Sequence, residues 1–160
     1  MPVALYAGSF DPVHLGHLGL IERAVRIYEE VVVGVVANPK KSAGMFTVDE
    51  RIRFVTEATS HLPTVRTRHF DGLTVDFARN EGANVLVRAA HKETADELSM
   101  AAMNLITADI PTIFVPADPL TRTISSSLIR QLVDAGQIAA AQELVPACVR
   151  QALADVATPA

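Results

Sequence analysis

The chain has 160 residues, of which 49% are hydrophobic and 20% charged, a balance typical of one globular domain and not of a disordered or fibrous protein. The formal net charge of −4 argues against nucleic-acid binding, so an anion site would have to be built locally. The single cysteine, Cys148, excludes an intramolecular disulfide. No apolar run approaches the roughly 18 residues of a membrane span, and no signal peptide is recognisable, so we expect a cytoplasmic protein without a membrane partner.

Five short apolar runs have the composition of β-strands. The run at 30–37, EVVVGVVA, is β-branched on both faces, as in a central parallel strand that is buried on both sides. The run at 65–70, VRTRHF, alternates in the way typical of a strand nearer the edge of a sheet. The predicted strands cover residues 3–6, 30–37, 65–70, 84–88 and 111–116.

A stretch with helical spacing of apolar residues follows each run. Thr47 and Glu50 have the spacing of a capping box, and Gly82 is typical of a helix C-terminus. The predicted helices cover residues 15–28, 47–59, 74–82, 93–108 and 125–135, with two more helical stretches after Gly136 and Pro146.

This alternation predicts an α/β fold: a Rossmann-like five-stranded parallel sheet with helices on both faces and extra C-terminal helices. We expect residues 1–157 to form a single domain and residues 158–160 to form a flexible tail. Ligands of such sheets bind beyond the carboxyl ends of the strands. The candidate loops are therefore 7–14, 38–46, 71–73, 89–92 and 117–124.

The stretch at 8–17, GSFDPVHLGH, joins the first strand to the first helix. A metal site would need a third ligand beside His14 and His17, and no cysteine or carboxylate cluster supplies one. A serine nucleophile would need a G-x-S-x-G elbow, which is absent. A helix N-terminus suits a phosphate, because its unpaired amides and partial positive charge face outward. A phosphate cradle is favoured, although two histidines that only pack or cap remain an alternative.

Several basic and hydroxyl side chains lie at the same predicted edge of the sheet. Lys40 and Lys41 follow the second strand, where they are either solvated or near a phosphate. Arg88 ends the fourth strand, as a structural ion-pair partner or an anion ligand. The stretch at 123–130, TISSSLIR, places three serines at a helix start, which fits an ordinary N-cap or a second phosphate cradle.

GSFDPVHLGH and TISSSLIR together resemble the two signatures of the nucleotidyltransferase superfamily with the T/HxGH motif. Over about residues 3–150 the chain is similar to the bacterial phosphopantetheine adenylyltransferase family, through the stretches NPKKSAGMFTVDERIRF, GLTVDFARNEGANVLVR and MAAMNLI. The resemblance implies transfer of AMP from ATP to 4′-phosphopantetheine, which gives dephospho-CoA and pyrophosphate without a covalent intermediate. It also implies Mg²⁺ held mainly by the ATP phosphates, a homohexamer, and CoA as a feedback ligand.

The resemblance assigns roles to residues that match the family's motifs. The catalytic residues it implies are Ser9, His17 and Lys41. The acceptor-binding residues it implies are Ser9, Lys41, Thr74 and Arg88. The ATP-binding residues it implies are Ser9, Phe10, His14, His17, Ala89, His91, Glu97, Thr121, Arg122, Thr123, Ser125, Ser126 and Ser127, and no residue is assigned to metal binding.

Three stretches depart from the family's pattern. Ser9 replaces the usual threonine, and Ala89-Ala90-His91 replaces a glycine, an apolar residue and an arginine that meets the ATP phosphates. Thr121-Arg122-Thr123 replaces an aromatic-Ser-aromatic stretch, so Arg122, His91 or Lys92 is a candidate for the missing positive charge. The alternatives are a related nucleotidyltransferase with another phosphate acceptor, and a non-catalytic nucleotide- or CoA-binding module.

Overall fold

The computed structural model describes residues 2–37, 44–90 and 95–157. The five strands are β1 (Val3–Gly8), β2 (Glu30–Val36), β3 (Val65–Phe70), β4 (Val85–Ala90) and β5 (Thr112–Pro116). The helices are α1 (Leu15–Ala24), α2 (Val48–Ala58), α3 (Thr74–Asn80), α4 (Ala95–Ala108), α5 (Ser126–Asp134), α6 (Ile138–Glu143) and α7 (Ala147–Ala157). Each predicted strand and helix is present, with ends that differ by a few residues. The predicted tail at 158–160 lies outside the described residues.

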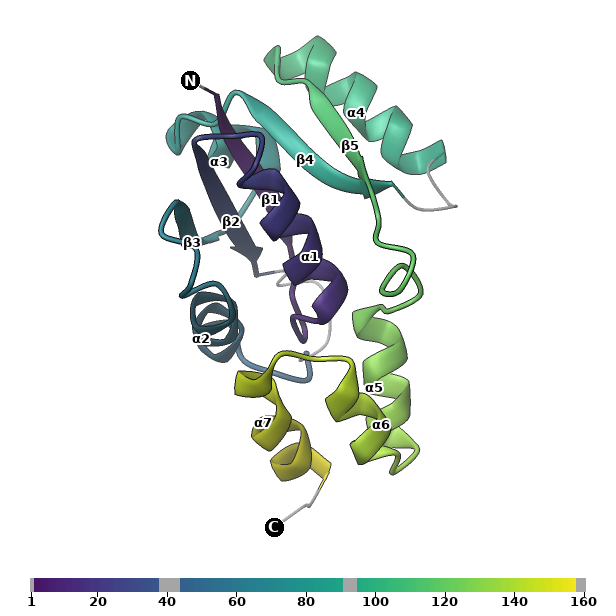
Figure 1. The fold of residues 1–160 in the computed structure, drawn as a ribbon. Helices are drawn as coiled ribbons and strands as arrows, with labels where there is room; N and C mark the ends of the chain where they lie inside the picture. Colours follow the sequence, from purple (N-terminus) through teal and green to yellow (C-terminus); the bar gives the residue numbers. More distant parts are fainter. Residues whose placement is uncertain (1, 38–43, 91–94, 158–160) are drawn as a thin grey trace.

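All five strands pair in parallel, in the order β3-β2-β1-β4-β5. The central position of β1 explains its uninterrupted apolar sequence, because both of its faces are covered. The Rossmann-like α/β prediction is therefore confirmed. Figure 1 shows α5, α6 and α7 gathered beyond the carboxyl ends of β1 and β2, where the extra C-terminal helices extend that edge.

Side chains that alternate along β1 enter two different cores. Ala4 and Tyr6 belong to the larger core, which also receives buried side chains from α1, α2, α5, α6 and α7. Leu5 and Ala7 belong to the smaller core with α3 and the end of α4. Helices therefore cover both faces of the sheet, as the sequence predicts.

The first helix is shorter than its apolar spacing predicts. The sequence favours residues 15–28, but α1 ends at Ala24, and the backbone N–H groups of Arg26 and Ile27 donate to carbonyls three residues back. Tyr28 is nevertheless 9% exposed and still donates to the Ala24 carbonyl, four residues back. The periodicity correctly identifies the buried side chains, and the tighter turns shorten only the regular helix.

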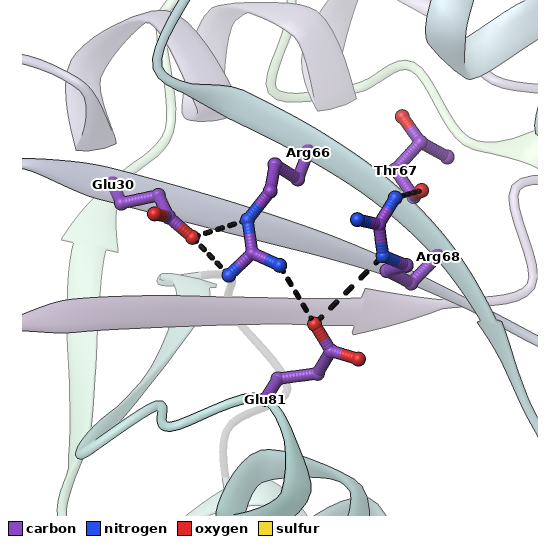
Figure 2. Close-up of polar contacts among 5 residues, drawn as sticks. All are labelled: Glu30, Arg66, Thr67, Arg68 and Glu81. Atoms are coloured by element: carbon purple, nitrogen blue, oxygen red, sulfur yellow. Dashed lines mark hydrogen bonds and ion pairs between the residues drawn. The ribbon is translucent and has the colours of Figure 1, made fainter.

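Charged side chains link the edge strand β3 to its surroundings (Figure 2). Arg66 forms ion pairs with Glu30 on β2 and with Glu81, which follows α3, the latter at 3.1 Å. Arg68 lies 3.9 Å from the same Glu81 carboxylate. Charge on an edge strand also discourages pairing with another sheet, so this network has a structural explanation.

Candidate active site

The loop from Ser9 to His14 leaves the carboxyl end of β1 and turns back into α1. Phe10 has a positive φ of 49°, and its ring is almost fully buried against Tyr6, with ring centroids 5.4 Å apart. The Phe10 ring also meets the His17 ring edge-on at 4.8 Å. Arg51, on α2, donates to the Ser9 carbonyl at 2.8 Å and so holds the start of the loop. Packing inside this turn therefore fixes the position of the His17 ring.

His14 and His17 form a reciprocal cap at the start of α1. The backbone N–H of His14 donates to His17 Nδ1 at 3.2 Å, and the backbone N–H of His17 donates to His14 Nδ1 at 3.3 Å. Because a backbone N–H can only donate, both Nδ1 atoms must be acceptors. Each neutral ring therefore carries its proton on Nε2. The capping geometry makes Nε2 of each ring a hydrogen-bond donor.

A cavity of about 580 Å³ opens between the N-terminal ends of α1 and α5. This volume is within the usual range for a small-molecule or cofactor site. Nine of the residues assigned to ATP line it: His14, His17, Ala89, Glu97, Thr121, Arg122, Thr123, Ser125 and Ser126. Six further residues line the cavity but were not predicted as site residues: Tyr6, Gly16, Leu20, Arg23, Ala117 and Ile124.

The segment before α5 forms one wall of this cavity and is held by an ion pair. Arg23, on α1, donates to the Asp118 carboxylate at 2.8 Å and to the Pro116 carbonyl at 2.9 Å. The Asp118 carbonyl in turn accepts the backbone N–H groups of Thr121 and Arg122. The turn that presents the Arg122 side chain is thus fixed from α1. Within the described residues, the Arg122 guanidinium makes no hydrogen bond or ion pair.

The serines of TISSSLIR have three different roles. Ser125 is the N-cap of α5, because its side chain accepts the backbone N–H of Leu128 at 3.1 Å. The Ser126 hydroxyl donates to the Pro12 carbonyl at 2.9 Å, which joins α5 to the first motif. The Ser127 hydroxyl accepts a hydrogen bond from Arg130 at 3.0 Å, and Ser127 is not among the residues that line the cavity.

Asp11 connects three segments of the site. Its two carboxylate oxygens accept the backbone N–H groups of Met45 and Phe46, both at 2.9 Å. Its backbone carbonyl accepts a hydrogen bond from Arg130 of α5 at 2.6 Å. The first motif, the segment before α2 and the second motif therefore meet at one buried residue.

A second cavity of about 110 Å³ adjoins the first, between α4 and strands β4 and β5. Its lining residues are Arg88, Glu97, Met100, Ala101, Asn104 and Thr112. Glu97 lines both cavities and so stands between them. Arg88 donates to the Ala7 carbonyl at 3.1 Å from one of its terminal nitrogens, which orients the guanidinium at the end of β4.

Tyr6 lines the larger cavity and remains a hydrogen-bond donor. Burial raises the pKa of its phenol far above the ordinary value of 10.0, while Arg88 lowers that pKa and Glu97 raises it. The phenol therefore stays neutral throughout the physiological pH range. The sequence indicated Tyr6 only as a strand residue, because nothing in a buried strand distinguishes a tyrosine that borders a cavity.

The remaining assigned residues lie apart from the two cavities or outside the described residues. Ser9 is exposed at the end of β1, Phe10 is buried beneath the first cavity, and Thr74 begins α3; none of them is a lining residue. Lys41 and His91, with Lys40 and Lys92, fall outside the described residues. Among the described residues, no group of three His, Cys, Asp or Glu side chains is placed to hold a metal ion.

Comparisons with known proteins place the chain in a family. The model of the cytidylyltransferase-like family matches residues 5–132. A phosphopantetheine adenylyltransferase from Rhodopirellula baltica is 46% identical over 81% of this chain and 74% of its own length. One from Heliobacterium modesticaldum is 40% identical over 85% of this chain and 82% of its own length.

The fold is also found in a solved structure of much lower sequence similarity. The lipopolysaccharide core biosynthesis protein from Thermoplasma volcanium superposes with a TM-score of 0.55 at 18% identity, covering 74% of this chain and 97% of that protein. This likeness supports the fold alone. The family model and the two closely similar relatives show more: the chain belongs to the phosphopantetheine adenylyltransferase family, within the cytidylyltransferase-like proteins.

Proposed function

We propose that this protein transfers AMP from ATP to 4′-phosphopantetheine, giving dephospho-CoA and pyrophosphate. The observation that carries the proposal is the pair of adjoining cavities that share Glu97. The larger lies between two helix N-termini, and the smaller contains Arg88. A nucleotide in the first and a phosphorylated acceptor in the second would meet at the carboxyl edge of the sheet, where such folds bind ligands.

The reaction needs positioning and charge stabilisation more than a covalent catalyst. An acceptor phosphate oxygen attacks the α-phosphorus of ATP, a new P–O bond forms, and the bond to the β-phosphate oxygen breaks to release pyrophosphate. Negative charge grows on the non-bridging oxygens as this happens. His17 would donate from Nε2 to one of these oxygens, since its Nδ1 is occupied by the His14 backbone N–H.

The phosphates of ATP would lie between the starts of α1 and α5, where helix dipoles favour anions. Ser125, Ser126, Thr121 and Thr123 offer hydroxyls from the same wall, and Arg122 supplies the positive charge. Ser127 would act through its hydrogen bond to Arg130. Mg²⁺ would be held mainly by the ATP phosphates themselves, and its role is to neutralise their charge.

The acceptor phosphate would bind near Arg88 and Ser9, and Thr74 would contact the acceptor farther along. Lys41 is proposed as a further ligand of this phosphate and falls outside the described residues. The Arg88 guanidinium is pre-oriented by the Ala7 carbonyl, so less side-chain freedom is lost on binding. Dephospho-CoA, the product, would occupy both cavities. CoA contains the same adenine and pantetheine portions, which is the chemical basis for our expectation that it acts as a feedback ligand.

A measurement of pyrophosphate release with ATP and 4′-phosphopantetheine tests the proposal. We expect turnover with this pair, and none when either substrate is omitted. A panel of ATP and CTP against several phosphate acceptors tests the alternative of a related nucleotidyltransferase with another acceptor. Turnover with another acceptor only would identify a related nucleotidyltransferase, and binding without turnover would identify a non-catalytic module.

We further propose a homohexamer in the cytoplasm. Exposed apolar side chains on α4 and β5 support self-association, because apolar groups so grouped usually mark an interface. They include Leu98, Met100, Met103, Leu105, Ile106 and Ile113. Sedimentation of the wild type and of Ile106→Glu tests this proposal, with smaller particles expected for the variant. None of the described helices is long and apolar enough to cross a membrane.

A further inference from the structure

The smaller cavity is lined by two residues whose buried polar atoms have no hydrogen-bond partner within the described part of the chain. Glu97 Oε2 and Thr112 Oγ1 are both shielded from solvent and have no hydrogen-bond partner among the described residues. Both residues line the same cavity. A buried polar atom without a partner destabilises the folded state, so native proteins seldom keep one without a reason. The cavity is therefore built to receive a group that makes these hydrogen bonds.

The chemistry of the two atoms limits what that group can be. An ionised carboxylate oxygen only accepts, so Glu97 needs an N–H or O–H donor and would repel a phosphate. The Thr112 hydroxyl can donate to a carbonyl oxygen. A secondary amide offers one N–H and one C=O in a fixed relation, and Met100 and Ala101 provide an apolar lining for the carbons beside it.

The register of the strands places Thr112 at a suitable distance from Arg88. Thr112 pairs with Leu86 on β4, and Arg88 lies two residues farther along that strand. Side chains two residues apart along a strand point to the same face of a sheet, about 7 Å from each other, and neighbouring strands lie about 4.8 Å apart. The Cβ atoms of Thr112 and Arg88 are therefore about 8 Å apart across the two strands. In 4′-phosphopantetheine a short carbon spacer of similar extent separates the phosphate from the nearer of its two amides.

We propose that Glu97 and Thr112 bind the amide of the acceptor that is nearest its phosphate. Thr112 donates to the amide carbonyl, and Glu97 Oε2 accepts the amide N–H, while Arg88 holds the phosphate. This inference rests on the proposed function and adds a substrate-binding role for Thr112, together with an acceptor-binding role for Glu97. It also predicts that the hydroxyl is retained for binding at a cost to the stability of the unliganded protein.

The test is Thr112→Val, which removes the hydroxyl and keeps the shape of the side chain. Isothermal titration with 4′-phosphopantetheine should show a Kd raised about 5- to 10-fold, the loss expected for one hydrogen bond. Without ligand, the Tm of the variant should rise by about 2–4 °C, because an unsatisfied buried hydroxyl is gone. Weaker binding together with higher stability is a combination that a structural role for Thr112 would not produce.

Thr107→Val is the matched control. The Thr107 hydroxyl lies on the exposed side of α4 and donates to the Met103 carbonyl at 2.7 Å, outside both cavities. The same chemical change there should leave the Kd for 4′-phosphopantetheine unchanged.

A second experiment uses an acceptor analogue in which an ester replaces the amide nearest the phosphate, so that the N–H is missing. Wild-type protein should bind it about 10-fold or more weakly, since the hydrogen bond to a carboxylate is lost.

The outcomes separate this inference from the proposed function. Binding of phosphopantetheine without AMP transfer would refute the proposed activity alone. An equal Kd for wild type and Thr112→Val would overturn the inference alone, as would a lowered Tm or a change of sedimentation in the variant. An ester analogue that binds as well as the amide would overturn the role given to Glu97, and no binding at all would overturn both proposals.

Discussion

His14 and His17 stack with their ring centroids 3.6 Å apart, and each Nδ1 accepts the other residue's backbone N–H. The side chains that begin α1 are therefore the same ones that face the cavity. Serine, threonine or aspartate would satisfy the N-cap equally well, but without a ring N–H on its far side. The cap thus fixes the tautomer of the residue proposed to contact the α-phosphate.

His17→Ala should lower kcat by about 10²- to 10³-fold, with a much smaller effect on the Kd for ATP. The contact from Nε2 strengthens as charge builds on the phosphorus oxygens, so its loss falls mainly on the transition state. Steady-state kinetics and titration with ATP measure the two effects. His61→Ala is the control, because His61 pairs with Glu22 on the surface. An unchanged kcat in His17→Ala would remove the role that we give this residue.

Gly16→Ala should weaken nucleotide binding, because the first turn of α1 packs tightly against the opposite wall. A Cβ at Gly16 would lie 3.0 Å from the His14 ring and 3.3 Å from the Thr121 carbonyl oxygen. Gly19, in the same helix, has no atom within 4 Å of such a Cβ. Gly19→Ala should therefore stabilise the protein by about 0.5–1 kcal/mol and leave the Kd for ATP unchanged. Equal affinities in the two variants would show that the contact at Gly16 is unimportant.

The sequence predicted the fold well because the strands and helices follow simple periodicities. β2 has the doubly buried composition of a central strand, and the α2 cap at Thr47 and Glu50 is present as a reciprocal pair. The end of α1 was less predictable, since the buried Tyr28 continues the helical spacing after the backbone has tightened into turns. The spacing of apolar residues predicts which side chains are buried better than it predicts where a regular helix ends.

The motifs predicted most of the larger cavity, but not the residues that support it. Arg23 and Asp118 are far apart in sequence, and no local pattern indicates that their ion pair fixes the wall before α5. Thr112 was expected only as a strand residue, because a hydroxyl on a strand usually faces solvent or a backbone partner. Tertiary pairings of this kind depend on how the strands are ordered in the sheet, which a single sequence does not reveal.

Asp11→Asn should destabilise the protein by about 1.5–3 kcal/mol. Both carboxylate oxygens accept a backbone N–H, and an asparagine can present only one oxygen to the pair, so one donor is left facing an NH₂ group. Urea denaturation gives the free energy of unfolding. Asp49→Asn, at the exposed first turn of α2, is the control and should cost less than about 1 kcal/mol. Similar losses in the two variants would contradict the connecting role of Asp11.

Arg122→Ala should raise the Kd for ATP, and more than it raises the Kd for AMP. The Arg122 side chain lines the cavity three residues before the N-cap of α5, and the ion pair of Arg23 with Asp118 fixes its backbone. A loss of about 1.5–3 kcal/mol is expected for a charged hydrogen bond to the triphosphate. Arg26→Ala, which removes an exposed arginine outside the cavity, is the control. Equal effects on ATP and AMP would place Arg122 against the AMP portion of the nucleotide, not against its β- and γ-phosphates.

Tyr6→Phe should reduce the loss of stability at alkaline pH. Burial raises the pKa of the Tyr6 phenol above its ordinary value of 10.0, so the folded protein keeps a proton that the unfolded chain loses as the pH passes 10.0. The unfolded state then binds fewer protons, and the free energy of unfolding falls with rising pH by at most about 1.4 kcal/mol per unit. Burial also raises the pKa of the Cys148 thiol, so the Tyr6→Phe variant and its reference protein should both carry Cys148→Ala.

Urea denaturation between about pH 8 and 11 should show that the free energy of unfolding declines less steeply in Tyr6→Phe. Its ring keeps the contact with Phe10 and has no proton to lose. Parallel declines for the two proteins would mean that Tyr6 ionises as easily in the folded state as in the unfolded chain.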